Sequence, residues 1–310
     1  MIRYILTSLT LMVIGVAFIA FQFYIKHSYT SCCTWQRMQP TISQHSVSDE
    51  ICCTANKKNS SIVRFAAFAS EPAFVQHHAE PLSYALLNST GTVITVKASD
   101  GTQCFGYEVV PSKFTRNVVF VFHEWWGLNN YIKQEAEKLS ADLSARVIAL
   151  DLYDGRVATS REEASKYMQS STPERSRTII AAFQRYVGPE AKIATIGWCF
   201  GGGWSHQAAL MLGKQAVGCV IYYGMPEMDS TALTSMNAPT LGIFARNDRW
   251  ITPEVVARFE ATAKALGKEV QTNMYDADHA FANPSNPRYQ RDMAQEAYTR
   301  VIAFLKRCFA

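Results

Sequence analysis

The segment from residue 117 to the C-terminus alternates between short apolar runs and longer stretches with helical periodicity. The apolar runs cover residues 117–122 (NVVFVF), 146–150 (RVIAL), 192–196 (KIATI), 218–223 (GCVIYY) and 240–244 (TLGIF), and residues 269–275 are predicted as a further strand. Continuous runs of this kind are typical of strands that are buried on both faces of a sheet. Strands that alternate with helices predict a mostly parallel central sheet with helices on both faces, so we expect an α/β fold.

The stretches between the runs have the spacing of amphipathic helices. Within residues 131–143, for example, apolar side chains recur every three or four positions. The predicted helices cover residues 131–143, 161–187 with a break near Pro173, 204–212, 253–266 and 287–304. A predicted hairpin of residues 92–96 and 104–110, joined by the turn sequence SDGT, precedes the alternation. We therefore expect the α/β domain to span residues 86–310.

The N-terminus differs in kind from the rest of the chain. Residues 5–25 form an uncharged run of 21 residues, and a helix of this length crosses a hydrocarbon core of about 30 Å. Residues 1–26 therefore read as a single-span membrane anchor or as a secretory signal. The run exceeds the usual signal core of about 7–15 residues, which favours the anchor. An uncleaved helix would tether the protein to a membrane, and cleavage would leave it secreted or periplasmic. A helix buried in the globular domain is a third reading.

Residues 27–85 show no clear period, and we interpret them as a linker of uncertain order. They contain two adjacent cysteine pairs, Cys32-Cys33 and Cys52-Cys53. Bridges between the pairs, acylation of the first pair and free thiols all remain open. Because no Cys-x2-Cys spacing accompanies the pairs, we expect no metal site.

Charge and composition narrow the classes of partner. The formal net charge is +4, and the sequence has no dense run of Lys or Arg of the kind that marks nucleic-acid binding. A hydrophobic content of 48% is enough for a sizeable core. We therefore expect a small-molecule substrate and no nucleic-acid partner, and we leave the oligomeric state open.

The sequence Gly197-Trp198-Cys199-Phe200-Gly201 lies between the 192–196 strand and a predicted helix. This strand–turn–helix context is that of a nucleophile elbow, with Cys where Ser is commoner. Such a turn needs residues without bulk on both sides of the nucleophile, and Gly197 and Gly201 meet that need. The sulfur would lie at a helix N-terminus, which favours thiolate. The Phe200 N–H would face a developing oxyanion.

The other members of a nucleophile–acid–histidine triad follow later strands. Asp248 comes after the 240–244 strand and His279 after the last strand. Open α/β sheets place their sites at the carboxyl ends of strands, so Cys199, Asp248 and His279 are expected to meet.

A further loop, His123-Glu124-Trp125-Trp126, follows the 117–122 strand. This loop normally supplies a second oxyanion-hole N–H, which we assign to Trp125. We expect Glu124 to direct its carboxylate toward the nucleophile; capping or ion pairing is the alternative. Trp126, and Trp198 beside the cysteine, are candidates for the wall of a substrate pocket.

From about Thr92 to Phe309 the chain resembles the dienelactone hydrolases (carboxymethylenebutenolidases), which have the α/β-hydrolase fold. The matching segments are SDGTQCFGYEVVPS, HEWWGLN, ALDLYDG, REEASK, IGWCFGG, YYG, ARNDRWITP and DADHAF. The resemblance implies that Cys199 attacks an ester or lactone carbonyl, and that Glu124 pairs with the resting thiol. It also implies that Arg161 holds a substrate carboxylate. A second family arginine is replaced here by Asn283, which puts a dienelactone substrate in doubt.

The sequence therefore predicts a hydrolase that cleaves a lactone or ester through a Cys-His-Asp triad and a thioester intermediate, with no metal or organic cofactor. A thioesterase or general carboxylesterase that uses the same residues is one alternative. A catalytically silent, membrane-tethered binding protein that keeps the fold is another.

Overall fold

The structure is a computed structural model that describes residues 60–310. The predicted N-terminal apolar helix with its 5–25 span, and the cysteines of the two adjacent pairs, lie outside the described residues. Within 60–310, no helix combines the length and the apolar character needed to cross a membrane.

The core of the fold is an eight-stranded sheet with the order β1-β2-β4-β3-β5-β6-β7-β8. The strands are β1 (Thr92–Lys97), β2 (Gln103–Val109), β3 (Asn117–Phe122), β4 (Arg146–Leu150), β5 (Lys192–Trp198), β6 (Ala216–Tyr222), β7 (Thr240–Ala245) and β8 (Val270–Tyr275). β1 and β2 pair antiparallel, and β2 is antiparallel to β4; every other pairing in this sheet is parallel. The predicted hairpin and the mostly parallel sheet are therefore confirmed.

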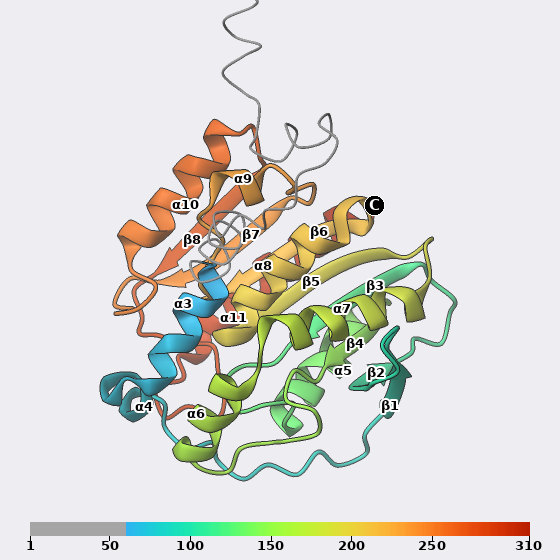
Figure 1. Ribbon diagram of the computed structural model, residues 1–310, viewed down its shortest axis with the longest axis horizontal. Helices are drawn as coiled ribbons and strands as arrows, with labels where there is room; N and C mark the ends of the chain where they lie inside the picture. Colours follow the sequence, from blue (N-terminus) through green and yellow to red (C-terminus); the bar gives the residue numbers. More distant parts are fainter. Residues whose placement is uncertain (1–59) are drawn as a thin grey trace, which may run out of the picture. The chain divides into compact units, whose positions relative to one another are not determined.

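Helices cover both faces of the sheet. They are α3 (Ser61–Ala67), α4 (Pro72–His77), α5 (Asn130–Leu143), α6 (Arg161–Ser170), α7 (Pro173–Val187), α8 (Phe200–Leu212), α9 (Ser230–Leu233), α10 (Pro253–Ala265) and α11 (Arg291–Phe309), with short 3-10 turns at Phe68–Ser70 and Gly213–Gln215. Figure 1 shows α7 and α8 in front of the sheet and α5 and α11 behind it. The predicted break near Pro173 is present, because Pro173 opens α7 and the Thr172 side chain caps its first turn.

The segment that precedes the sheet is more ordered than the sequence predicts. Residues 61–78, which we call the N-terminal arm, form α3, a 3-10 turn and α4. Phe65 and Phe74 of the arm are at most 1% exposed and belong to the main hydrophobic core. Their rings pack edge to face, with centroids 5.8 Å apart. The predicted boundary at residue 86 is therefore too late, and the 27–85 segment is not a linker throughout.

Candidate active site

Cys199 lies in a sharp turn between β5 and α8. Its backbone has φ 55° and ψ −118°, a conformation that is strained for any residue with a side chain. A Cβ on Gly197 would lie 2.1 Å from the Gly201 carbonyl oxygen, and a Cβ on Gly201 would lie 2.2 Å from the Phe122 carbonyl oxygen. Strand and helix therefore approach this closely only because both flanking residues are glycine, as the elbow sequence predicts.

Asp248 and His279 lie on the loops after β7 and β8, at the same edge of the sheet as Cys199. Nδ1 of His279 is 2.6 Å from Oδ2 of Asp248, and both side chains are fully buried. The other carboxylate oxygen, Oδ1, accepts hydrogen bonds from the backbone N–H groups of Trp250 and Ile251 at 2.9 and 3.0 Å. A carboxylate can only accept, so Nδ1 carries a proton and the ring presents Nε2 to the site.

Electrostatics couples the same three side chains. Burial raises the pKa of Asp248, but the nearby imidazole and its hydrogen bonds bring this pKa below its ordinary value. Burial lowers the pKa of His279, but the Asp248 carboxylate and the Cys199 sulfur raise this pKa well above its ordinary value. The pair therefore favours a carboxylate beside an imidazolium whenever a proton reaches the ring.

The sulfur of Cys199 meets two imidazoles. Sγ, one ring nitrogen of His279 and one ring nitrogen of His78 all lie within 4.8 Å of one another. Nε2 of His279 has no hydrogen-bond partner among residues 60–310. The three predicted triad residues therefore come together from three separate loops, and a fourth side chain joins them. The spacing of these three ligand atoms would also suit a metal ion.

His78, at the end of the N-terminal arm, is a site residue that the sequence analysis missed. Its Nε2 is 3.8 Å from Sγ of Cys199, and its Nδ1 is 2.8 Å from the Phe74 carbonyl oxygen. The ring stacks on Trp125, with centroids 4.7 Å apart and planes 7° apart. Burial and the neighbouring His279 lower the pKa of His78 to about 3, so the ring is neutral at physiological pH. No sequence pattern indicates this role, because residues 27–85 show no clear period.

Glu124 is buried beside the site and is held by Asn283. Nδ2 of Asn283 lies 2.7 Å from one carboxylate oxygen of Glu124 and 2.9 Å from the other. Oδ1 of Asn283 accepts two hydrogen bonds from Ser285, which fixes the orientation of the amide. Burial raises the pKa of Glu124 to about 7, although His279 and Asn283 act in the opposite direction. The residue that stands where the family has an arginine therefore binds the predicted carboxylate.

Of the two residues predicted for the oxyanion hole, Phe200 directly follows Cys199, and Trp125 stacks on His78, whose Nε2 contacts the Cys199 sulfur. Phe200 opens α8, so its backbone N–H is one of the N–H groups at the start of that helix. Trp125 follows Glu124 directly, and its indole is fully buried against His78.

Two of the three predicted substrate-binding residues do not line the cavity beside the site. Nε of Arg161 donates to the His78 carbonyl oxygen at 2.7 Å, so this guanidinium binds the N-terminal arm. Trp126 is 1% exposed and packs edge to face on Trp125, as part of the core. Only Trp198 lines the cavity beside the site. The sequence did not show that a carbonyl of the arm would reach Arg161.

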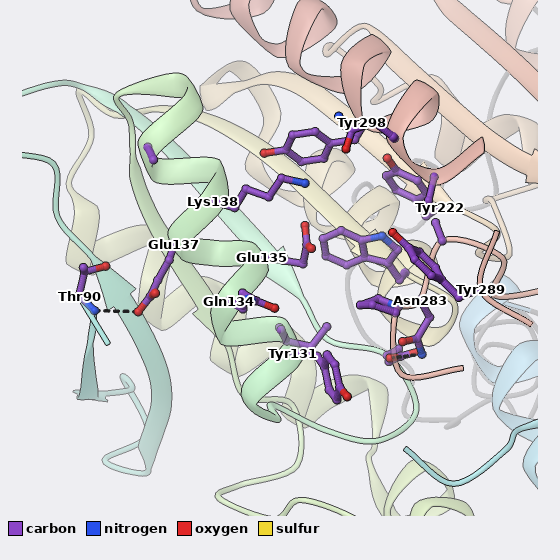
Figure 2. A pocket seen from close by; sticks show the side chains of 18 residues that line it. Thr90, Tyr131, Gln134, Glu135, Glu137, Lys138, Tyr222, Asn283, Tyr289 and Tyr298 are labelled. Atoms are coloured by element: carbon purple, nitrogen blue, oxygen red, sulfur yellow. Dashed lines mark hydrogen bonds between the residues drawn. The ribbon is translucent and has the colours of Figure 1, made fainter. Parts of the chain in front are cut away.

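That cavity has a volume of about 620 Å³ and lies next to the Glu124–Asn283 pair. Its wall includes the aromatic residues Tyr131, Trp198, Tyr222, Tyr289 and Tyr298. Figure 2 shows Glu135 and Lys138 of α5 pointing across the cavity toward Tyr222 and Tyr298. Trp198 directly precedes Cys199 in the chain, but the Cys199 side chain is fully buried and does not itself line the cavity.

Comparison with known proteins shows which family this architecture belongs to. The family model described as "Dienelactone hydrolase family" matches residues 105–309. A protein of Aquifex aeolicus named "Putative carboxymethylenebutenolidase" is 28% identical over 221 residues, which cover 67% of this chain and 94% of that protein. "Protein usf" of Aquifex pyrophilus is 27% identical over 221 residues, with the same coverage of 67% and 94%.

Solved structures show the same fold. The dienelactone hydrolase-like promiscuous phosphotriesterase P91 from metagenomic libraries aligns with a TM-score of 0.62 and 21% identity, over 71% of this chain and 100% of that one. The Pyrococcus furiosus esterase Pf2001 aligns with a TM-score of 0.57 and 16% identity, over 75% and 99%. With the family model covering most of residues 60–310, the chain belongs to the dienelactone hydrolase family and has its α/β-hydrolase fold.

Proposed function

We propose that this protein hydrolyses carboxylic esters or lactones through a covalent thioester on Cys199, with His279 as the proton carrier and Asp248 as the residue that orients it. One observation carries the proposal. Asp248 holds Nδ1 of His279 at 2.6 Å, Nε2 has no partner within residues 60–310, and one ring nitrogen of His279 lies within 4.8 Å of the sulfur. A nucleophile, a base and an orienting acid in this order perform acyl transfer on several unrelated folds.

The first half of the reaction forms the acyl-enzyme. His279 takes the thiol proton on Nε2, and the Cys199 thiolate attacks the carbonyl carbon. The carbonyl π electrons move to oxygen, where the backbone N–H groups of Phe200 and Trp125 stabilise the negative charge. The oxyanion then reforms the double bond, the bond to the leaving oxygen breaks, and that oxygen takes the proton from His279.

The second half of the reaction restores the enzyme. His279 takes a proton from water, and the resulting hydroxide attacks the thioester carbonyl. When the tetrahedral intermediate collapses, the carbon–sulfur bond breaks and its electron pair returns to Cys199. The sulfur then takes the proton from His279, which restores the thiol and the neutral imidazole. The raised pKa of His279 favours the imidazolium at both intermediates, because the Asp248 carboxylate stabilises it.

The cavity favours substrates without a carboxylate. Among the residues that line it, one is a cation, Lys138, and three are carboxylic acids, Glu124, Glu135 and Glu137. Nζ of Lys138 lies 3.4 Å from the centroid of the Tyr298 ring, so an aromatic face already contacts this charge. A substrate carboxylate would add another negative charge to an acidic cavity whose lining contains no arginine to bind it through two hydrogen bonds. Aromatic walls and little positive charge suit neutral, aromatic esters or lactones.

The nucleophile is tested by hydrolysis of a neutral nitrophenyl acetate by full-length protein. Cys199→Ala should lower the rate by at least about 10³-fold, because the covalent step is lost. Cys308→Ala, which removes a half-buried cysteine near the end of α11, is the matched control and should stay close to wild type. Mass spectrometry of quenched reactions should find the acetyl group on the peptide that contains Cys199. An unchanged rate in Cys199→Ala would refute the proposal.

The substrate class is tested by pairs of lactones that differ only by a carboxylate. We expect higher kcat/KM for the neutral member of each pair. Lys138→Met, which removes the cation of the cavity, should leave that preference in place. A preference for the carboxylate-bearing lactone would assign a classical dienelactone substrate and contradict our reading of the cavity.

We also propose that residues 5–25 attach the protein to a membrane. The proposal rests on their length and lack of charge. In the native cells, full-length protein should remain in the membrane fraction after alkaline extraction. Replacement of two central residues of the run by arginine should release it. Recovery of the wild type in the supernatant would contradict attachment.

A further inference from the structure

His78 makes a contact that the proposed triad does not require. The triad accounts for Cys199, Asp248 and His279, yet Nε2 of His78 lies 3.8 Å from the sulfur, across 121 positions of sequence. Both side chains are buried, so water does not compete for this contact.

Hydrogen bonding fixes which atom carries the proton. A carbonyl oxygen only accepts, so Nδ1 of His78 must be the donor in its 2.8 Å contact with the Phe74 carbonyl. In the neutral ring, Nε2 is then an acceptor. The complementary donor in the 3.8 Å contact is the S–H of Cys199. A thiolate would instead face the nitrogen lone pair, which is repulsive.

Contacts on several sides hold the imidazole in this place. Trp125 stacks on one face of the ring. The Arg161 guanidinium binds the His78 carbonyl at 2.7 Å, and Arg288 donates to the His77 carbonyl. Two cations therefore bind the last carbonyls of α4, where a helix attracts positive charge. Arg161 belongs to α6 and Arg288 to the loop before α11. Two separate parts of the domain therefore bind the end of the arm.

We propose that His78 is a positioning residue that holds resting Cys199 in its thiol form until substrate binds. The proposal rests on the proposed function of Cys199 as the nucleophile. To react, the sulfur must direct its proton away from His78 and give it to Nε2 of His279. The S–H bond then breaks, an N–H bond forms on His279, and His78 keeps its own single proton. The carboxylate of Glu124 is bound by Asn283, and within residues 60–310 the hydrogen-bond contact of the sulfur is with His78.

Other titratable groups also face Cys199 and His78, and a test must separate their effects from that of His78. They are His77 on α4, Asp248 and His279 after β7 and β8, Glu124 after β3, Tyr153 after β4 and Tyr223 after β6. His77 is the useful control, since it is adjacent to His78 and its ring lies 5.0 Å from that of Trp250.

The test measures alkylation of Cys199 by iodoacetamide against pH, with full-length wild type, His78→Phe and His77→Phe. Phe keeps a flat ring for Trp125 but has no acceptor nitrogen. Loss of the acceptor removes a hydrogen bond to the neutral thiol, so the midpoint in His78→Phe should move to lower pH by about one unit. That shift is a tenfold change in the ratio of thiolate to thiol. His77→Phe should keep the wild-type midpoint.

Two outcomes would overturn the proposal. If His78→Phe is alkylated faster by the same factor at every pH, the ring only blocks access to the sulfur. If the midpoint is the same as in wild type and His77→Phe, the 3.8 Å contact has no influence on the proton. Ultraviolet titration of the thiolate, with Cys199→Ser as the baseline, reads the midpoint where alkylation is too slow. Neither measurement requires hydrolysis, so this proposal and the proposed function can fail separately.

Discussion

The amide of Asn283 donates to both carboxylate oxygens of Glu124, at 2.7 and 2.9 Å, inside the protein. Unlike an arginine, this amide carries no charge with which to neutralise the carboxylate. Burial therefore prevails, and the pKa of Glu124 is raised to about 7. The site holds a carboxyl group that titrates near physiological pH.

Glu124 should make the stability of the fold depend on pH. Its folded pKa lies above its ordinary value of 4.5, so its contribution is fully present below about pH 4.5 and is lost as pH rises through about 7. Glu124→Gln removes the ionisation and should flatten the fall in unfolding free energy between pH 5 and pH 8 by up to about 3 kcal/mol. Urea unfolding at the two pH values measures this. An equal fall in both proteins would show that Glu124 does not titrate in this range.

Asp248 should control the tautomer of His279. Asp248→Asn presents an amide to Nδ1 and favours the wrong tautomer, so ester hydrolysis should drop by about 10³- to 10⁴-fold. Asp278→Asn changes the acid directly before His279 and is the matched control. Steady-state kinetics on a neutral ester gives the comparison. Similar losses of rate in both variants would show that the 2.6 Å contact between Asp248 and Nδ1 of His279 has no specific role in catalysis.

Gly201 should tolerate no side chain. A Cβ there would lie 2.2 Å from the Phe122 carbonyl oxygen, which is backbone and cannot rotate away. Gly201→Ala should lower the unfolding free energy by about 3 kcal/mol or more. Gly213→Ala has a positive φ of 59° but open space around it, so it should lose only about 1 kcal/mol. Comparable losses in denaturant titrations would contradict the close approach.

Arg161 should hold the N-terminal arm rather than a substrate carboxylate. Arg161→Met removes the donor to the His78 carbonyl, and amide hydrogen exchange of residues 61–78 should accelerate by about tenfold. Lys166→Met, on the exposed side of the same helix, should leave that exchange unchanged. Protection equal to wild type in Arg161→Met would show that the arm does not depend on this bond.

The sequence was most informative where chemistry is local. Gly197 and Gly201 reveal the elbow because a strained turn between a strand and a helix leaves room for no other residue. Asp248 and His279 could be placed because parallel strands bring their carboxyl ends to one edge of the sheet. In these cases the strand that directly precedes the residue, together with the parallel order of the sheet, determines where the side chain lies.

The N-terminal arm could not be predicted in the same way. Its helices have seven and six residues, too short for a reliable helical period. His78 gains its role only from long-range contacts with Cys199 and Trp125. Arg161 was recognised as a cation of the site region, but its partner is a backbone carbonyl, which no side-chain pattern indicates. Asn283 was recognised only as a departure from the family pattern. Its hydrogen bonds to Glu124 became evident only from the structure.

The complete burial of Cys199 also bears on how long the protein survives in an oxidising environment. Peroxides convert cysteine stepwise to sulfenic, sulfinic and sulfonic acids, and they attack a thiolate that they can reach. The side chain of Cys199 is 0% exposed, and His78 at the end of the arm contacts its sulfur. If His78 keeps this covered sulfur protonated between catalytic cycles, as we propose, the sulfur meets neither condition. Oxidative damage should therefore accumulate with the number of turnovers rather than with time.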